Sequence, residues 1–173
     1  MYKTVLTRFV IFFVLFLLIP TSFLFAQDQL FLLRHVTNIR PLSDDLTTNA
    51  TSATYKPIFG AGDRDAEKLK GIVRYGELTV DPGGTSAIIS YPAEEQIYYI
   101  LEGKGTLLYD GQKVPVKKND YMYVPVGVKH GILNSSDQPV RLLVMGYRIP
   151  SGTEVPPTPK LMMASADDMN LHT

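Results

Sequence analysis

The sequence predicts an all-β protein, folded as one closed sandwich or barrel. Between residues 69 and 150 the chain consists of short segments rich in Val, Ile and Tyr, separated by turn residues. Asp110-Gly111 lies between two of these segments, a signal typical of a type I′ hairpin. No run of ten or more residues has the apolar spacing of an amphipathic helix.

The overall composition excludes several classes of function. The 173 residues carry 17 basic and 17 acidic side chains and no Cys. A balanced charge without a basic stripe argues against a nucleic-acid partner. The absence of Cys excludes disulfides, thiolate zinc sites, iron–sulfur clusters and a cysteine nucleophile. The length fits about one domain.

Residues 1–26 have the pattern of a secretory signal peptide. Lys3 and Arg8 precede an unbroken apolar run over residues 9–19, which Pro20 ends before a small residue, Ala26. We therefore expect an exported protein, periplasmic or secreted, cleaved after Ala26. The alternative is an uncleaved membrane anchor, since residues 9–26 are just long enough to span a bilayer. No other contact with a membrane is expected.

The rest of the chain divides into three parts. Residues 27–68 are expected to form an N-terminal arm, with a short strand within residues 28–36 and a polar surface loop over 37–53. Residues 69–150 carry the expected barrel. Residues 151–173 form a Pro-rich linker and a tail. The apolar spacing of the tail repeats that of the first strand, so the tail is either a strand on the same domain or the start of a second barrel.

The barrel strands are expected at hairpin spacing. The first covers residues 70–80, is ended by a turn at Asp81-Pro82-Gly83-Gly84, and is followed by a strand over 85–91. The later strands are expected at residues 96–103, 105–109, 112–117, 121–126, 128–134 and 140–148.

Two stretches resemble the paired motifs of the cupin superfamily. Pro125-x-Gly127-x-x-His130-x-x-x-Asn134 matches the second motif, with Asn119 at its opening Gly position. Gly103 matches the end of the first motif. Over residues 70–148 the chain thus resembles a cupin-2 type conserved barrel domain. The resemblance implies a single double-stranded β-helix, the small jelly-roll barrel of that family.

The resemblance also indicates where a metal would bind. In the family, two His and one Glu of the first motif and the His of the second bind a divalent transition metal. Here those positions hold Ser90, Pro92, Gln96 and His130, so only His130 is retained. Metal sites of this kind need three or four imidazole or carboxylate ligands. We therefore expect no metal cofactor at the family site.

Glu94 and Glu95 offer an alternative metal site with His130. In a strand, Glu95 faces away from Gln96 and would need a bulge to point inward, whereas Glu94 has the inward parity.

A ligand site without a metal is the other possibility. By strand alternation Ser90, Gln96 and Tyr98 share one face, and His130 and Asn134 share another. In the cupin register these side chains would meet in an apolar pocket, which is typical of a small-molecule site. The alternative is that His130 and Gln96 only satisfy each other inside a packed barrel.

The sequence therefore favours a metal-free, exported cupin that binds a small ligand, or a structural barrel that forms a homodimer or pairs with a second cupin barrel. The alternative is an enzyme. It would be a metal-dependent dioxygenase, isomerase or lyase using His130 with Glu94 or Glu95. A second version is metal-free epimerase-like catalysis with His130 as base and Tyr98 as acid, although no carboxylate is evident to orient the imidazole.

Overall fold

A computed structural model describes residues 32–155 and 161–169. The secondary structure of this part consists of strands and three single-turn 3-10 helices, η2 (Val36–Asn38), η3 (Ala66–Lys68) and η4 (Ala166–Asp168). The strands are β1 (Thr51–Gly60), β2 (Ile72–Thr85), β3 (Glu94–Glu102), β4 (Lys104–Tyr109), β5 (Gln112–Lys117), β6 (Asp120–Val124), β7 (His130–Leu133), β8 (Val140–Arg148) and β9 (Met162–Ser165).

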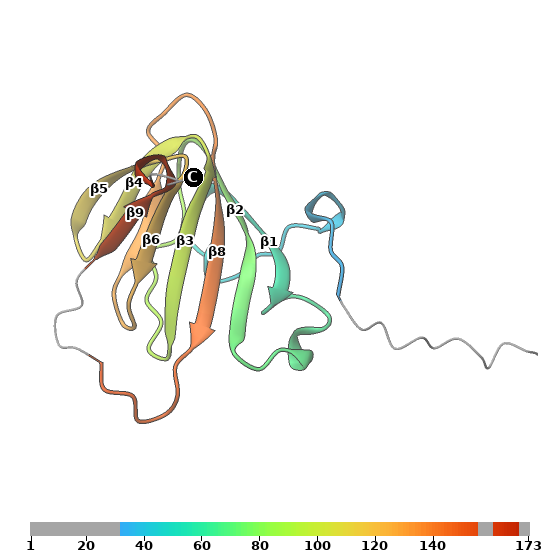
Figure 1. Cartoon of the computed structure of the whole chain (residues 1–173). Coiled ribbons are helices and arrows are strands. Elements are labelled where there is room, and N and C mark those ends of the chain that lie inside the picture. The colour runs from blue at the N-terminus through green and yellow to red at the C-terminus, as the bar shows by residue number, and fades with distance from the viewer. Residues whose placement is uncertain (1–31, 156–160, 170–173) are drawn as a thin grey trace, which may run out of the picture. The chain divides into compact units, whose positions relative to one another are not determined.

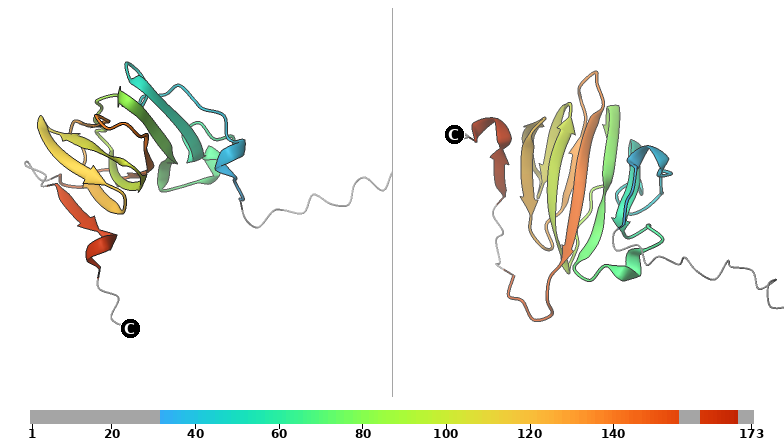
Figure 2. Two further views of the ribbon diagram at one scale, coloured as in Figure 1. Left: turned by 90° about the horizontal axis from the view of Figure 1, so that it is seen from above. Right: turned by 45° about the vertical axis from the view of Figure 1, so that its right-hand side comes forward.

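The strands form one curled antiparallel sheet (Figure 1). Its order is β5-β4-β7-β2-β8-β3-β6-β9, and β1 pairs with the free edge of β2. Seen from above, the sheet curves around its own inner face (Figure 2). The all-β jelly-roll fold predicted from the sequence is confirmed.

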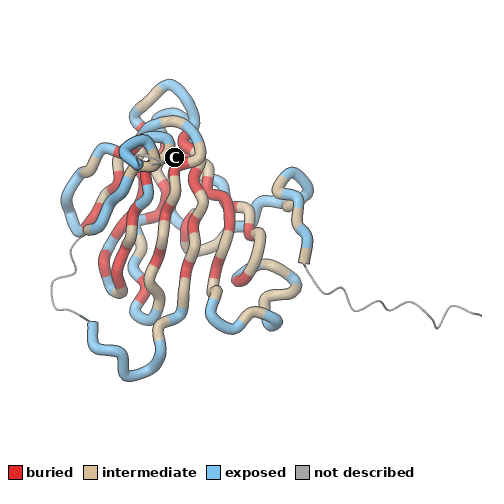
Figure 3. Tube along the Cα trace, in the orientation of Figure 1, coloured by how far each residue is buried: buried red, intermediate tan, exposed pale blue. Residues whose placement is uncertain are grey.

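The core lies on the inner face of this sheet. Burial alternates along β3 and β8, so that every second side chain points inward (Figure 3). Each fully buried aliphatic side chain contributes about 1.5–3 kcal/mol relative to exposure. The inward aliphatic residues include Leu78, Val80, Ile100, Leu107, Met122, Val124, Ile132, Val140, Leu142 and Val144.

Two turns have the geometry that their residues predict. Asp110 and Gly111 both have positive φ, 45° and 80°, as a type I′ hairpin requires. Asn119 has φ 73°, so it adopts the left-handed conformation of the glycine that the cupin motif has there.

The turn expected at residues 81–84 does not end the first barrel strand. β2 continues through these residues to Thr85, because β1, which the sequence did not predict, pairs along it. The register jumps between Thr51↔Thr85 and Ala53↔Val80, so Asp81 to Gly84 form an irregularity within the strand. The strand expected over 85–91 is reduced to one bridge, Ile89↔His130.

The two ends of the chain also differ in part from expectation. In the described part of residues 28–36 there is no strand, and the chain turns into η2; the strand of the arm is β1 instead. The tail strand β9 pairs with β6, from Asp120↔Ser165 to Tyr123↔Met162. This agrees with a tail strand on the same domain.

The predicted signal peptide lies outside the described residues. Within residues 32–155 and 161–169, no helix is long and apolar enough to cross a membrane.

Candidate functional site

His130 and Tyr98 form the centre of the candidate site. Both are 1% exposed, and the Tyr98 hydroxyl lies 3.0 Å from Nε2 of His130. Nδ1 of His130 lies 2.8 Å from the carbonyl oxygen of Val128, which can only accept. Nδ1 therefore carries the proton, and Nε2 accepts the hydrogen bond that the Tyr98 hydroxyl donates.

Burial decides the protonation state of this pair. Burial lowers the pKa of His130, and the Arg74 guanidinium lowers it further, against a raising effect from the Val128 carbonyl. Burial also raises the pKa of Tyr98. The pair is therefore a neutral imidazole and a neutral phenol at pH 7.

Gln96 and Glu94 form a second hydrogen-bonded pair. Nε2 of Gln96 donates to Glu94 at 3.0 Å, while its Oε1, on a residue 1% exposed, has no partner. Gln96 therefore does not bond His130, contrary to the alternative in which the two satisfy each other. Gly146 makes this arrangement possible: it lies opposite both Arg74 and Gln96, and a Cβ there would come within 2.7 Å of each.

Arg74 brings a buried cation into the barrel. Its side chain is 6% exposed and faces three carboxyl groups. Two parallel bonds join it to Asp45 at 2.8 and 3.0 Å, Glu94 lies at 3.3 Å, and Asp44 lies at 3.7 Å. Burial lowers the pKa of Arg74, but the hydrogen bond and charge of Asp45 raise it overall. Burial, together with Asp45, raises the pKa of Asp44.

Tyr55 and Tyr91 complete this group. Tyr91 lies between Arg74 and His130. The guanidinium carbon of Arg74 is 4.4 Å from the centre of the Tyr91 ring, and the centres of the Tyr91 and His130 rings are 6.0 Å apart. Tyr55 packs over Gly76, where a Cβ would be 2.4 Å from its hydroxyl. The Tyr55 hydroxyl has no hydrogen-bond partner, and the Tyr91 hydroxyl interacts only with Asp45, outside ordinary hydrogen-bond geometry. Burial raises the pKa of both.

The polar cluster, as we call it, comprises Asp44, Asp45, Tyr55, Arg74, Tyr91, Glu94, Gln96, Tyr98 and His130. Among the described residues, four buried side-chain polar atoms have no hydrogen-bond partner. Three of them belong to this cluster: Tyr55 Oη, Tyr91 Oη and Gln96 Oε1.

A turn from the N-terminal arm supplies Asp44 and Asp45. The Asp44 side chain accepts a hydrogen bond from Leu46 N, and its backbone oxygen accepts from Thr47 and Thr48. Leu46 is 1% exposed and is bound to Ala87 N through its carbonyl at 2.8 Å. The turn is therefore held by its own bonds to Asp44 and is joined to the barrel at Leu46, directly after Asp45.

Two of the predicted site residues lie elsewhere. Ser90 is exposed and does not belong to the buried cluster. Asn134 is buried but structural: its Nδ2 donates to the carbonyls of Val80 and Gln138, and its Oδ1 accepts from Ser136. These bonds hold the β7–β8 loop.

Sequence reasoning missed Arg74, Asp44 and Asp45, although it named Glu94 as an inward-facing residue. Arg74 has the strand parity of the buried Leu78 and Val80, so alternation in β2 would have placed it inside. No local pattern points to Asp45, because its position depends on where the arm packs.

The donor atoms of the cluster do not fit a transition metal. Nε2 of His130 already accepts from Tyr98, Gln96 offers one neutral oxygen, and Glu94 is bonded to Arg74. Glu95 points away, to the Tyr123 hydroxyl at 2.9 Å. A buried guanidinium in the same group repels a second cation. In the described part of the chain, no three His, Asp or Glu are grouped as metal ligands.

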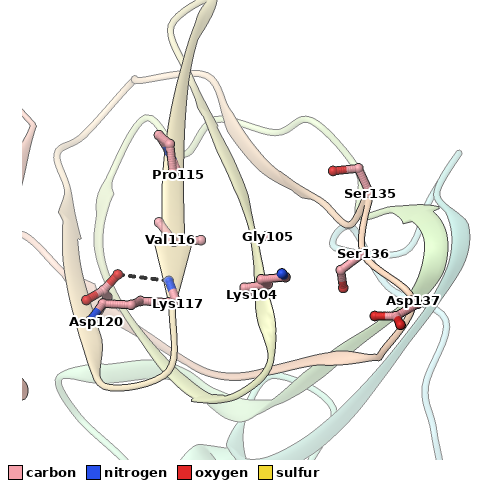
Figure 4. Close-up of a pocket in the computed structure, with 9 residues that line it drawn as sticks. All are labelled: Lys104, Gly105, Pro115, Val116, Lys117, Asp120, Ser135, Ser136 and Asp137. Atoms are coloured by element: carbon pink, nitrogen blue, oxygen red, sulfur yellow. Dashed lines mark hydrogen bonds between the residues drawn. The ribbon is translucent and has the colours of Figure 1, made fainter.

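A separate cavity lies on the surface beside β4 and β5 (Figure 4). Its volume is about 570 Å³, and none of the predicted site residues lines it. Lys104 and Lys117 face Asp120 and Asp137 around it, so its charges are balanced. Gly105 is also among its lining residues.

Comparison with known proteins identifies the barrel. Residues 76–146 match the profile of the Cupin domain family. The chain carries a cupin domain of the cupin-2 type. A Thermotoga maritima structure described as a predicted oxalate decarboxylase superimposes on this chain with TM-score 0.59 and 20% identity. The superposition covers 68% of this chain and all of that one. The polyketide cyclase RemF of Streptomyces resistomycificus gives TM-score 0.57 and 23% identity, over 69% and 82%.

Curated relatives match the same region of the cupin domain. An uncharacterized protein of Methanocaldococcus jannaschii is 37% identical over 71 residues, which is 41% of this chain and 57% of that protein. The oxalate-binding protein of Thermotoga maritima is 28% identical over 71 residues, or 41% and 59%. The chain therefore spans less than two thirds of the length of these relatives. These matches confirm the cupin resemblance.

Proposed function

We propose that this protein is a metal-free cupin that binds a small polar ligand at the polar cluster. The observation that supports this is the grouping of buried polar atoms without a hydrogen-bond partner, Tyr55 Oη and Gln96 Oε1, around one buried arginine. A buried donor or acceptor without a partner costs about 1–3 kcal/mol, and native proteins hold few of them. A ligand with polar groups would satisfy them.

The chemistry of the cluster suits binding better than the enzyme alternatives. The His130–Tyr98 pair resembles an acid–base pair, but Nδ1 of His130 is bonded to a backbone carbonyl and no carboxylate orients it. A metal-dependent reaction would need His130 with Glu94 or Glu95, and these side chains are committed to other partners.

Native mass spectrometry of the full chain tests this proposal. We expect a retained small molecule, or binding of an added probe such as oxalate, which the name of the Thermotoga maritima relative suggests. Gln96→Leu should reduce the bound fraction, and the exposed Gln138→Leu should not. Elemental analysis of protein purified without chelator gives the second readout. A stoichiometric metal that disappears in His130→Ala would overturn the metal-free proposal.

A structural, dimerising barrel is the second candidate, because β9 is an edge strand of the sheet that the described residues form. β9 is the last strand in the sheet order, and Met162 and Met163 on it are 56% and 40% exposed. Tyr121 of the adjacent β6 is also exposed, on the same face of the sheet as Met162. Such an edge can accept a strand of a second copy or of a second cupin barrel. Light scattering should show a dimer that Met163→Lys dissociates; a monomer at high concentration contradicts this.

We also propose that the protein is exported, on the basis of the sequence of residues 1–26. N-terminal sequencing of protein from the periplasm or medium should begin at Gln27. Full-length protein retained in the membrane fraction would support the anchor instead.

A further inference from the structure

We propose that the ligand of the polar cluster is a small carboxylic acid, and that Asp45 occupies the place of its carboxylate on Arg74. This inference rests on the proposed function and adds the class of ligand. It also assigns Asp45 as an internal competitor that must move before the ligand binds.

The contact between Asp45 and Arg74 has the geometry of a bound carboxylate ligand. Both carboxylate oxygens accept from the terminal nitrogens of the guanidinium, at 2.8 and 3.0 Å. Proteins use this two-bond fork of Arg to hold planar anions with defined orientation. Arg74 is 6% exposed, and the position of the anion on it is open to solvent, since the Asp45 side chain that occupies it is 41% exposed.

The negative charge already around Arg74 requires that the ligand carboxylate replace one of the carboxylates there rather than join them. Arg74 already faces Asp44, Asp45 and Glu94, so a fourth carboxylate would be repelled in a buried setting. If the ligand carboxylate replaces that of Asp45, the charge of the cluster and both hydrogen bonds of Arg74 are preserved.

Asp45 is the carboxylate best placed to leave. Its side chain is 41% exposed, compared with 15% for Asp44 and 17% for Glu94. Within the described turn, Asp44 is fixed by its bond to Leu46 N, whereas the Asp45 side chain takes no part in the turn's own hydrogen bonds. Rotation of the Asp45 side chain toward solvent therefore frees the guanidinium without unfastening the turn.

The unpartnered atoms refine the ligand class. Gln96 Oε1 needs a donor, and Gln96 and Arg74 both border Gly146. A hydroxyl next to the carboxylate of the ligand would supply that donor. Glycolate, the smallest 2-hydroxy acid, is therefore the probe of choice, and glycolamide is its neutral counterpart.

Calorimetric titration of glycolate at constant ionic strength tests the inference. A competitor that vacates the site 1–10% of the time weakens apparent affinity about 10–100-fold. We therefore expect Asp45→Ala to bind glycolate about 10–100-fold more tightly than the natural chain. Glycolamide should show no such gain. Asp137→Ala, which removes an exposed carboxylate from the β7–β8 loop, is the matched control and should leave binding unchanged.

One further variant, together with Gln96→Leu, separates the possible failures. Adding Arg74→Gln to Asp45→Ala should abolish the gain; if that chain does not fold, the comparison with glycolamide still decides. Equal or weaker glycolate binding by Asp45→Ala, or an equal gain for glycolamide, overturns the inference. If native mass spectrometry then still finds a ligand that Gln96→Leu releases, the proposed function stands without it. If no variant binds any small molecule, both fail.

Discussion

The Tyr98 hydroxyl donates a hydrogen bond of 3.0 Å to Nε2 of His130, where the cupin fold elsewhere presents a histidine to a metal. Tyr98→Phe would leave a buried ring nitrogen without a donor. We expect a loss of about 1–3 kcal/mol in the free energy of unfolding, measured by urea denaturation. Tyr123→Phe, which removes a half-buried hydroxyl bonded to Glu95 at 2.9 Å, is the control and should cost less. Equal losses would contradict the assignment.

The lowered pKa of His130 predicts how stability changes with pH. In the unfolded chain a histidine binds a proton near pH 6.5. Burial lowers the pKa of folded His130, with Arg74 adding to the effect, so below pH 6.5 protons favour the unfolded chain. The stability that neutral His130 contributes is fully present above the pKa of the histidine in the unfolded chain. It is lost as the pH falls through the lower pKa of His130 in the folded chain.

Urea denaturation between pH 5 and pH 7 measures this effect. Stability of the natural chain should fall with acidification, and His130→Asn should flatten the dependence. His35→Asn, at an exposed histidine, should keep the natural slope. A variant His130→Asn with an unchanged slope would show that another group is responsible.

Gly146 predicts a cost for the smallest possible added side chain. A Cβ there would meet Arg74 Cγ and Gln96 Nε2 at 2.7 Å, so both buried side chains would have to move. We expect Gly146→Ala to lose about 1–3 kcal/mol, as overpacked cores do. Gly71→Ala has open space around the new atom and serves as the control. Thermal unfolding of the two variants compares them, and similar melting temperatures would contradict the packing at Gly146.

The barrel could be predicted from the sequence because its signals are local. Alternation placed Gln96 and Tyr98 inward and Glu95 outward, and the hairpin at Asp110-Gly111 followed from its residue types. The partners of these side chains could not be predicted in the same way. Asp45 reaches Arg74 across 29 positions of sequence, through a turn whose place depends on the packing of Leu46.

Distant partners also explain why Asp81 to Gly84 do not end the strand and why Asn134 lies outside the polar cluster. Asp-Pro-Gly-Gly is a turn by composition, but β1 pairs with Val80 before it and with Thr85 after it, so it becomes an irregularity within β2. Asn134 has the inward parity of a site residue, yet its amide is used to hold the loop that follows. Strand parity says which way a side chain points, not which partner it finds.

The carboxylates around Arg74 predict a large loss of stability when the charge of this side chain is removed. Arg74→Met leaves Asp44, Asp45 and Glu94 facing one another without a cation, and breaking a buried pair from one side costs about 3–5 kcal/mol. Lys117→Met, at a side chain 63% exposed and paired with Asp167, which is 44% exposed, should cost no more than about 1 kcal/mol. Urea denaturation of both variants gives the comparison.

Asp45→Asn then identifies the source of the cost at Arg74. Added to Arg74→Met, it removes one of the uncompensated charges, so the double variant should be more stable than the sum of the two single losses. This holds because residues in one ion-pair network are coupled, whereas distant sites add independently. Strictly additive losses would mean that Arg74 acts through the packing of its aliphatic stem rather than through its charge, and that Asp45 is not its principal partner.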